Sequence, residues 1–359
     1  MISVLGLSLY GHQAASHRVR LSQFQPGLEA AGIDLRIHSL LDDAYLQRSF
    51  SGGRPSLRGL LAAYGRRIQA LRQADRFDLA IVHCELLPFL PGWLERQLLQ
   101  IPFLYDYDDA FFLKYRSGRF RLLQPMLGAK ADRLMAAAMA VTAGNAGLAA
   151  YASRFNSSVS VLPSVVDTDH FRPADRSRAV CSGQPFTVGW IGSPSTAPYL
   201  QLLIDPLQQL ARERPVRLLV VGGSAPVIAG VEVIEQSWSL EQEVSLIQQF
   251  DVGVMPLPDT PWSRGKCAYK LIQCMACGIS VVASRVGANV DAVASGCGLL
   301  ADSSQQWLTS FRQLAADPAE RLQLGAAAHQ WVERHYSLRS ALPLLTSVIQ
   351  RAAAAQPRR

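Results

Sequence analysis

A cluster of cations stands out in DTPWSRGKCAYKLIQCMACGISVVAS, residues 259–284. The chain has only four lysines, and two of them, Lys266 and Lys270, lie here four residues apart, shortly after Arg264. Cations in the first turns of a helix oppose the positive end of its dipole, so a bound anion best explains them. The spacing i, i+4, i+7 would place Lys266, Lys270 and Gln273 on one helix face. We expect a phosphate site here; the alternative is a solvated basic helix end.

Three aspartates, Asp106, Asp108 and Asp109, lie within YDYDDAFF, which begins as a predicted strand. The Asp-Tyr-Asp spacing is found in some metal sites. The carboxyl end of a buried strand is, however, where α/β proteins bind their ligands. We therefore expect no metal here and predict that these carboxylates face the ligand cleft. The alternative is that they cap the loop.

A second polar segment, YGHQAASHRVR, follows the first predicted strand. Gly11 would let the backbone approach a ligand, and His12 and Arg18 come after it. Arg18 and Arg20 cannot share a helix face, so at most one of them readily points toward the ligand. The alternative for the others is a solvated helix start.

Two further groups favour structural roles. His83 ends a predicted strand with Glu85 after it, which we interpret as a satisfied strand-end pair rather than a catalytic one. Cys274 and Cys277 form a CxxC motif without a second pair or a nearby histidine, inside an apolar helical pattern. They are expected to be packing thiols, and the chain's six cysteines fit a reducing compartment.

Composition limits the classes of protein. A chain of 359 residues exceeds what one core usually serves, so two domains are expected. No apolar run approaches the ~20 residues of a membrane span. The opening MISVLGLSLYGHQ reads as a strand, not a signal peptide, and we expect a cytoplasmic protein. Of the net charge of +7, residues 1–165 carry +6 (18 Lys+Arg against 12 Asp+Glu), which suits an acidic substrate, an anionic membrane or nucleic acid.

Short apolar strands alternate with amphipathic helices, which predicts an α/β fold with parallel, doubly wound sheets. The predicted strands are ISVLGLSL, IDLRIHSL, FDLAIVHC, IPFLYDY and MAVTAG, then FTVGWIG, RLLVVGG, VEVIE, DVGVMPL and ISVVAS. A polar stretch at residues 173–185 separates the two sets. We expect two Rossmann-like domains facing across a cleft that holds the ligand. The absence of GxGxxG argues against a nicotinamide or flavin dinucleotide.

Several segments together resemble the family-4 glycosyltransferases, which have the GT-B fold. They are the cationic segment, VSVLPSVVDTDHF, WIGSPSTAPYL and CMACGISVVASRVGANVDAV, with YDYDDAFF and ASHRVR resembling one bacterial branch. The likeness covers nearly the whole chain. It implies an acceptor-binding domain at residues 1–165 and a nucleotide-sugar-binding domain at residues 166–345. Residues 346–359 would then be a helix end and tail that packs back on the first domain.

The resemblance implies a hexosyltransferase-like enzyme of polysaccharide biosynthesis that moves a sugar from a UDP- or GDP-linked donor to a glycan, lipid-linked or small-molecule acceptor. We expect retention of anomeric configuration and no cofactor or metal, since positioned cations would stabilise the diphosphate leaving group. Donor contacts are expected from Gly192, Ser193, Gly222, Trp238, Gln273, Gly287, Ala288 and Asn289. Catalytic roles are expected for Asp108, Arg264, Lys266 and Lys270. The acceptor or sugar side would include Gly11, His12, Arg18, Asp106 and Asp109.

The sequence departs from the family pattern at the donor site. Gly265 and Gln273 occupy the places of a glutamate pair that many members carry eight residues apart. Ser193 and Pro194 replace an arginine and a lysine after the second domain's first strand. We infer that Arg264, Lys266 and Lys270 together neutralise the diphosphate. Trp238 would lie beside a base, or alternatively in the core.

Residues 111–133 interleave aromatic and basic side chains, which is typical of a face on an anionic membrane. Single-stranded nucleic acid or a solvated helix flank are the alternatives. We expect peripheral association with the inner face of the cell membrane and no nucleic-acid partner. The rival functions are a GT-B sugar-nucleotide epimerase, a phosphorylase, and a catalytically degenerate GT-B binding protein, which the missing glutamates favour.

Overall fold

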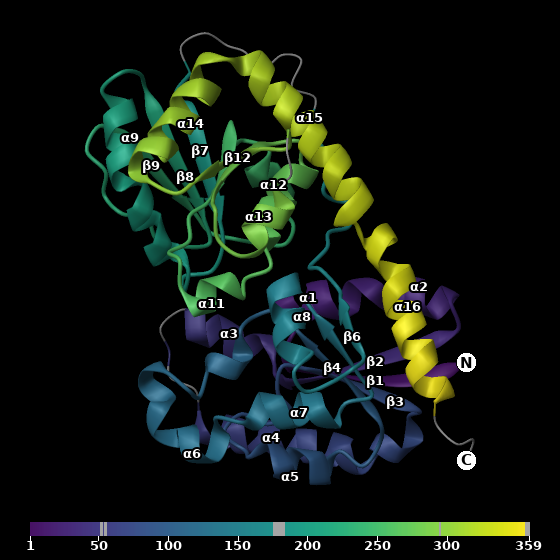
Figure 1. Ribbon diagram of the computed structural model, residues 1–359. Coiled ribbons are helices and arrows are strands. Elements are labelled where there is room, and N and C mark those ends of the chain that lie inside the picture. The colour runs from purple at the N-terminus through teal and green to yellow at the C-terminus, as the bar shows by residue number, and fades with distance from the viewer. Residues whose placement is uncertain (51–52, 54–55, 175–183, 294–295, 356–359) are drawn as a thin grey trace. The chain divides into compact units, whose positions relative to one another are not determined.

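The computed structural model describes residues 1–50, 53, 56–174, 184–293 and 296–355. The chain divides into two compact units, and Figure 1 labels most of their elements. Unit 1 comprises Met1–Ser164, Gly265–Cys267 and Leu338–Arg359, and unit 2 comprises Val165–Arg264 and Ala268–Ser337. The chain thus returns to unit 1 at Leu338, where residue 346 was expected. Most of the expected linker, residues 175–183, lies outside the described residues.

Unit 1 contains a six-stranded parallel sheet in the order β2-β1-β3-β4-β5-β6. Its strands are β1 (Ile2–Tyr10), β2 (Ile33–Leu41), β3 (Leu79–His83), β4 (Phe103–Tyr107), β5 (Ala140–Ala143) and β6 (Val159–Val161). Its helices are α1 (Ala15–Arg20), α2 (Gln25–Ala30), α3 (Asp43–Phe50), α4 (Leu57–Arg72), α5 (Gly92–Leu98), α6 (Gln124–Leu127), α7 (Lys130–Ala137), α8 (Ala146–Ala152) and α16 (Leu338–Ala354).

Unit 2 contains a second six-stranded parallel sheet, in the order β12-β11-β10-β7-β8-β9. Its strands are β7 (Phe186–Ile191), β8 (Val216–Val221), β9 (Val231–Gln236), β10 (Val252–Met255), β11 (Ser280–Ser284) and β12 (Leu299–Ala301). Its helices are α9 (Ile204–Ala211), α10 (Glu243–Ile247), α11 (Pro261–Arg264), α12 (Tyr269–Ala276), α13 (Ala288–Ala292), α14 (Ser304–Ala316) and α15 (Pro318–His335).

The two sheets confirm the prediction of two Rossmann-like domains, and all ten predicted strands form. The sequence pattern missed the two short edge strands β6 and β12. Between β4 and β5 the structure has a 3₁₀ turn at Gly118–Leu123, followed by α6 and α7 as separate helices. Pro125 lies in the first turn of α6, and Gly128 follows its last residue. Proline suits a helix start and glycine a helix end, which explains the break.

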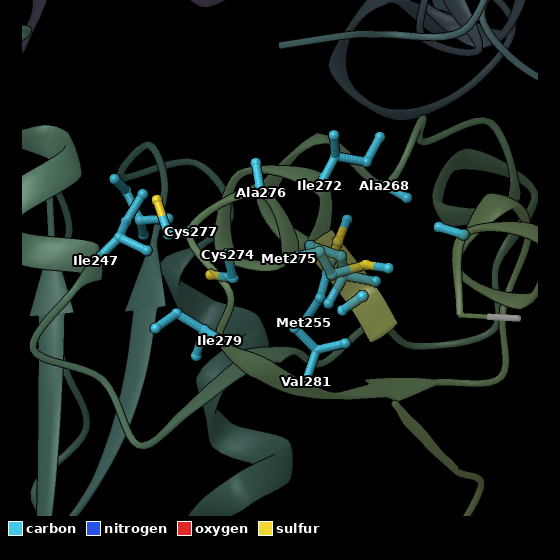
Figure 2. Close-up of a cluster of buried hydrophobic side chains, with 14 of the residues drawn as sticks. Ile247, Met255, Ala268, Ile272, Cys274, Met275, Ala276, Cys277, Ile279 and Val281 are labelled. Atoms are coloured by element: carbon cyan, nitrogen blue, oxygen red, sulfur yellow. The ribbon is translucent and has the colours of Figure 1, made fainter. Parts of the chain in front are cut away.

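Helices cover both faces of the unit 2 sheet. In β8, Leu218 and Val220 belong to a core cluster with residues of α9 and α14. Leu219 and Val221 belong to another cluster, which includes residues of α12 and α15. Successive strand residues point to opposite faces, so each strand of a doubly wound sheet must be apolar on both. Figure 2 shows Cys274 and Cys277 among the buried side chains of the second cluster, as packing thiols.

Helix α16 groups with unit 1, where it packs against α2, β3 and β4 (Figure 1). Gly27 in α2 makes room for this contact, because a Cβ atom there would lie 2.4 Å from Cδ2 of Leu342. The apolar side of α16, with Leu345, Val348 and Ile349, is buried. Among the described residues, no helix is both long and apolar enough to cross a bilayer.

Gly189 in β7 provides a test of the unit 2 core. A Cβ atom at this position would lie 1.9–2.2 Å from ring atoms of Phe250, which is 1% exposed. Because the ring is rigid and buried, Gly189→Ala should lower the free energy of unfolding by about 2 kcal/mol, measured by urea denaturation. The control is Gly65→Ala in α4, where a Cβ atom meets nothing within 4 Å. That change should stabilise by up to about 1 kcal/mol. Equal stability of the two variants would contradict this packing.

Candidate functional site

The loops after β7 and β8 bring several donor-site candidates of unit 2 together. A Cβ atom at Gly192 would lie 2.4 Å from Cε of Lys270. Gly222 has φ +80°, and a Cβ atom there would lie 2.5 Å from the carbonyl oxygen of Gly192 and 3.1 Å from Cβ of Trp238. Only glycine fits these close approaches. The four residues therefore form one neighbourhood at the carboxyl ends of the two strands.

Lys270 supplies the cation of this neighbourhood. It lies in the first turn of α12, with Nζ 2.6 Å from Oγ1 of Thr196 and 4.6 Å from the ring centroid of Trp190. Ser193 is exposed in the same loop as Thr196, with its Oγ 2.9 Å from Oγ of Ser195. An ammonium group at a helix N-terminus, beside hydroxyl groups and a glycine, has the chemistry of an anion-binding surface.

The expected helix face with Lys266, Lys270 and Gln273 does not form. Ala268 is the N-cap of α12 and has left-handed backbone angles (φ 55°, ψ 17°), so Lys266 lies outside the helix. The three residues before Ala268 group with unit 1. There, Nζ of Lys266 is 2.9 Å from each carboxylate oxygen of Asp109. Lys266 and Lys270 therefore have separate partners, because the left-handed residue ends the helical periodicity.

Arg264 also has a partner of its own. Its Nε and terminal nitrogen donate to the two carboxylate oxygens of Asp259, at 2.6 and 2.8 Å, and its side chain is 64% exposed. Its backbone contributes to the neighbouring loop, because a Cβ atom at Gly287 would lie 2.7 Å from the carbonyl oxygen of Arg264. Of the three predicted cations, Lys270 is thus the one that lies beside Gly192.

Gln273 is buried and bonds to Glu243, a residue that sequence reasoning missed. The Nε2 of Gln273 is 3.3 Å from Oε2 of Glu243, which also accepts a hydrogen bond from Nε1 of Trp238 at 3.0 Å. Glu243 is 2% exposed. Nothing in the sequence marked Glu243, since it lies in an ordinary amphipathic helix pattern. Trp238 itself is half-buried and packs against the core cluster that includes residues of α12 and α15. Its indole is therefore fixed both by this packing and by the hydrogen bond to Glu243.

The loop after β11 holds the remaining donor candidates. Gly287 has φ +54° and is the N-cap of the short helix α13, which Ala288 begins. Asn289 is 1% exposed, and its Nδ2 donates to the carbonyl oxygens of Ser284 and Met255, at 3.0 and 3.4 Å. The side chain of Asn289 therefore fixes this loop to β10 and β11.

We predicted that Asp106 of unit 1 faces a ligand. In the structure its side chain points into the interior instead. It is 2% exposed and accepts hydrogen bonds from Nε of Arg20 (3.1 Å), Nδ1 of His83 (2.8 Å) and Oγ1 of Thr142 (2.6 Å). A second nitrogen of Arg20 also binds it. Burial tends to raise the pKa of Asp106, but the Arg20 charge and these bonds hold it well below its usual range. The prediction was wrong because a buried arginine requires a counter-charge.

His83 pairs with Asp106, not with Glu85. Burial lowers the pKa of His83, but the bond to Asp106 and the charge of Asp108 raise it overall. Its Nε2 lies 3.7 Å from Oδ1 of Asp108 and 3.4 Å from Sγ of Cys84. Asp108, expected to be catalytic, has a side chain that is 18% exposed. Of the three aspartates, Asp108 and Asp109 retain some exposure, and Asp106 does not.

In the first loop of unit 1, two of the predicted ligand contacts are occupied by other groups of the protein. A Cβ atom at Gly11 would lie 2.4 Å from Oδ1 of Asp43, so the close approach at Gly11 is made by this carboxylate. A terminal nitrogen of Arg18 donates to the carbonyl oxygens of His12 and Gln13, at 3.0 and 2.8 Å. His12 remains exposed.

Part of the basic segment at residues 111–133 points inward. Lys130 is 3% exposed, with Nζ 3.0 Å from Glu85 and 2.9 Å from Glu95. Lys114 also pairs with Glu85, at 2.8 Å. The same segment leaves Leu122 93% exposed. The sequence could not separate these cases, because a basic residue next to a buried acid looks the same as one in solvent.

Comparisons with known proteins agree with this architecture. Residues 185–317 match the model of a family described as glycosyl transferases group 1. A D-inositol 3-phosphate glycosyltransferase of Segniliparus rotundus is 28% identical in an alignment 266 residues long that covers 66% of this chain. The chain spans only 58% of the length of that relative.

Two solved structures share the fold over nearly the whole chain. Sucrose-phosphate synthase of Thermosynechococcus elongatus has a TM-score of 0.73 and 17% identity, covering 99% of this chain and 100% of its own. HepE of Anabaena, in complex with UDP-glucose, has a TM-score of 0.72 and 15% identity, covering 98% and 100%. At these identities the likeness shows the fold alone.

Asp106→Asn should destabilise unit 1, because it leaves the buried Arg20 charge without a neutralising carboxylate. We expect the free energy of unfolding to fall by about 3 kcal/mol, measured by urea denaturation. The matched control is Asp108→Asn, at a partly exposed carboxylate, which should cost about 1 kcal/mol or less. If Asp106→Asn is no more destabilising than Asp108→Asn, Asp106 does not have this structural role.

Proposed function

We propose that this GT-B glycosyltransferase moves a sugar from a nucleotide-sugar donor, bound by unit 2, to an acceptor bound by unit 1. The observation that carries the proposal is the meeting of Gly192, Gly222, Trp238 and Lys270 at the carboxyl ends of β7 and β8. Ligands of Rossmann-like units bind outside these strand ends. HepE, which shares the fold, was crystallised with UDP and with UDP-glucose, which supports a UDP-linked donor; a GDP-linked one is the alternative.

Lys270 would neutralise the diphosphate leaving group. Breaking the anomeric bond leaves negative charge on the nucleoside diphosphate, and a fixed cation lowers the barrier by stabilising that charge. The N–H groups in the first turn of α12 and the hydroxyl of Thr196 would add hydrogen bonds. We propose that this arrangement replaces a metal ion at the diphosphate. Arg264 and Lys266 would bind the diphosphate only if they left their partners Asp259 and Asp109. Lys270 is therefore the first candidate for neutralising it.

Glu243 would position the nucleoside contacts. Its buried carboxylate holds both the Trp238 indole and the Gln273 amide, which restricts their rotation. We propose that Trp238 lies beside the base and that Gln273 binds the ribose. Gln273 and Gly265 stand where family members carry glutamates. The resemblance implies retention of the anomeric configuration, and the stereochemistry of the product tests this part of the proposal.

The acceptor would bind unit 1 near Asp108, the partly exposed carboxylate at the end of β4. A carboxylate there could accept a hydrogen bond from a sugar or acceptor hydroxyl. The acceptor class is a glycan, a lipid-linked saccharide or a small molecule. The missing glutamates favour a second candidate, a degenerate protein that binds nucleotide without transfer. An epimerase would instead isomerise the donor without any acceptor.

The Lys270 variant tests donor binding. UDP or GDP should raise the melting temperature of the wild-type protein by mass action, and UDP- and GDP-sugars should do the same. Lys270→Ala should weaken this binding roughly 10- to 100-fold, since a hydrogen bond to a charged group contributes about 1.5–3 kcal/mol. Arg264→Ala, the matched control at an ion-paired surface cation, should bind nearly as the wild type does. Equal affinity of both variants would remove Lys270 from the site.

Transfer itself is measured with the nucleotide-sugar that binds, an acceptor panel and NMR of the product's anomeric configuration. Sugar transfer that persists in EDTA supports the proposed reaction. Nucleotide binding without transfer to any acceptor supports the degenerate binding protein, and isomerised donor without acceptor supports the epimerase.

We propose further that the protein is cytoplasmic and associates with the inner face of the cell membrane through residues 118–133. Leu122 and Met126 are 93% and 50% exposed there, and Arg121 and Arg133 are exposed as well. Phe89, 48% exposed, extends this apolar surface through its ring contact with Phe120. Apolar and cationic side chains together suit an anionic lipid surface, where a lipid-linked acceptor would be found.

Leu122→Asp should reduce co-sedimentation with phosphatidylglycerol vesicles several-fold, because it removes apolar area and adds repulsion from the anionic surface. The matched control is Leu322→Asp in α15, an apolar residue that is 45% exposed in unit 2. It should sediment as the wild type does. Identical sedimentation of both variants, or none for the wild type, would contradict membrane association through this segment.

A further inference from the structure

Three side chains of different chemistry meet where β3 and β4 end in unit 1. They are the imidazole of His83, the thiol of Cys84 and the carboxylate of Asp108, and their possible ligand atoms all lie within 4.8 Å of one another. Nε2 of His83 is 3.4 Å from Sγ of Cys84 and 3.7 Å from Oδ1 of Asp108. The proposed transfer reaction uses Asp108 but gives no role to the other two.

The backbone at Cys84 explains how neighbouring side chains come together. Successive strand residues normally point to opposite faces of a sheet. Cys84 has φ +65°, a left-handed conformation that costs a non-glycine residue of order 1–2 kcal/mol. The Cys84 N–H donates to the carbonyl oxygen of Asp106 (2.9 Å), and its C=O accepts from the Tyr105 hydroxyl (2.8 Å). These bonds hold the thiol beside the His83 ring.

The ring of His83 is oriented by its other nitrogen. Nδ1 donates to the buried carboxylate of Asp106 at 2.8 Å, which leaves Nε2 directed toward Cys84 and Asp108. Asp106 is fixed in turn by Arg20 and Thr142. A histidine that binds a metal almost always donates its second ring N–H to a carboxylate or carbonyl in this way.

Two of the three separations between the ligand atoms are close to those around a tetrahedral ion. Zinc bonds of about 2.0–2.3 Å to nitrogen, oxygen and sulfur, at tetrahedral angles, separate the ligand atoms by roughly 3.4–3.6 Å. The 3.4 Å between Sγ and Nε2 and the 3.7 Å between Nε2 and Oδ1 are close to these values. The three groups could therefore surround one ion with small side-chain movements.

We propose that His83, Cys84 and Asp108 bind one zinc ion or a chemically similar divalent transition metal. Sulfur and imidazole ligands select this class over magnesium and calcium, which prefer oxygen. Binding forms a metal–sulfur bond as the thiol releases its proton to water. Three protein ligands leave a fourth position for water, and the partly exposed Asp108 provides the entry. The site belongs to unit 1 and is independent of the diphosphate contacts proposed in unit 2.

Metal binding to the full chain tests the site directly. After chelator treatment and removal of the chelator, wild-type protein dialysed against micromolar zinc should retain about one equivalent, measured by atomic absorption. With cobalt(II) in place of zinc, a sulfur-to-cobalt charge-transfer band should appear in the near ultraviolet. Cys84→Ser should lose that band and weaken binding at least roughly tenfold, and Asp108→Asn should weaken binding while keeping the band.

The control is Cys297→Ser, which removes another buried thiol, in unit 2, and should bind as the wild type does. Circular dichroism shows whether each variant is folded. UDP binding by Cys84→Ser should be unchanged, so failure of the metal site and failure of the donor site are distinguishable. Wild-type protein that retains no zinc, or a Cys84→Ser variant that keeps the cobalt band, would overturn the proposal. In that case the thiol only hydrogen-bonds to the imidazole.

Discussion

Arg20 carries its guanidinium into the interior of unit 1, and the carboxylate of Asp106 compensates that charge. An unpaired buried charge would cost several kcal/mol, so β4 must present Asp106 inward. The same carboxylate binds Nδ1 of His83 and therefore sets the direction of Nε2. Asp108, two residues further along, is left at the partly exposed strand end. One ion pair thus links α1, β3 and β4 and arranges the groups available for chemistry in unit 1.

In unit 2, the packing of helix α12 determines the position of Lys270. Leu271, Ile272 and Met275 pack this helix into the core. Figure 2 shows the side chains of Ile272 and Met275 within the buried cluster. The first turn of the same helix presents Lys270 beside Gly192 and Thr196. Apolar packing therefore determines where the cation lies, and Gly192 leaves room for the Lys270 side chain beside the strand end.

The two units contribute different chemistry to the proposed reaction. In unit 2, a lysine, backbone N–H groups and a buried glutamate that orients Trp238 and Gln273 suit a nucleoside diphosphate. In unit 1, a partly exposed carboxylate beside an oriented imidazole and a thiol suits a hydroxyl-bearing acceptor or a soft divalent ion. Charge neutralisation at the donor and ligand binding in unit 1 can therefore be altered separately.

The two parallel α/β units were predictable from the amino-acid sequence, because apolar periodicity and glycine-terminated strands are local signals. The sequence also predicted Lys270, Gly192 and Gly222 as donor contacts, and the structure brings these three residues together. Which charged side chains remain available to a ligand depends on contacts between distant segments of the chain. Asp106 and Lys130 have ordinary sequence contexts, yet each is paired with a residue that is distant in the sequence. The role of Glu243 could not be predicted for the same reason. The left-handed residues Cys84 and Ala268 also interrupt the periodicity from which strands and helices are predicted. Pairing and backbone handedness arise from long-range packing, which no local pattern encodes.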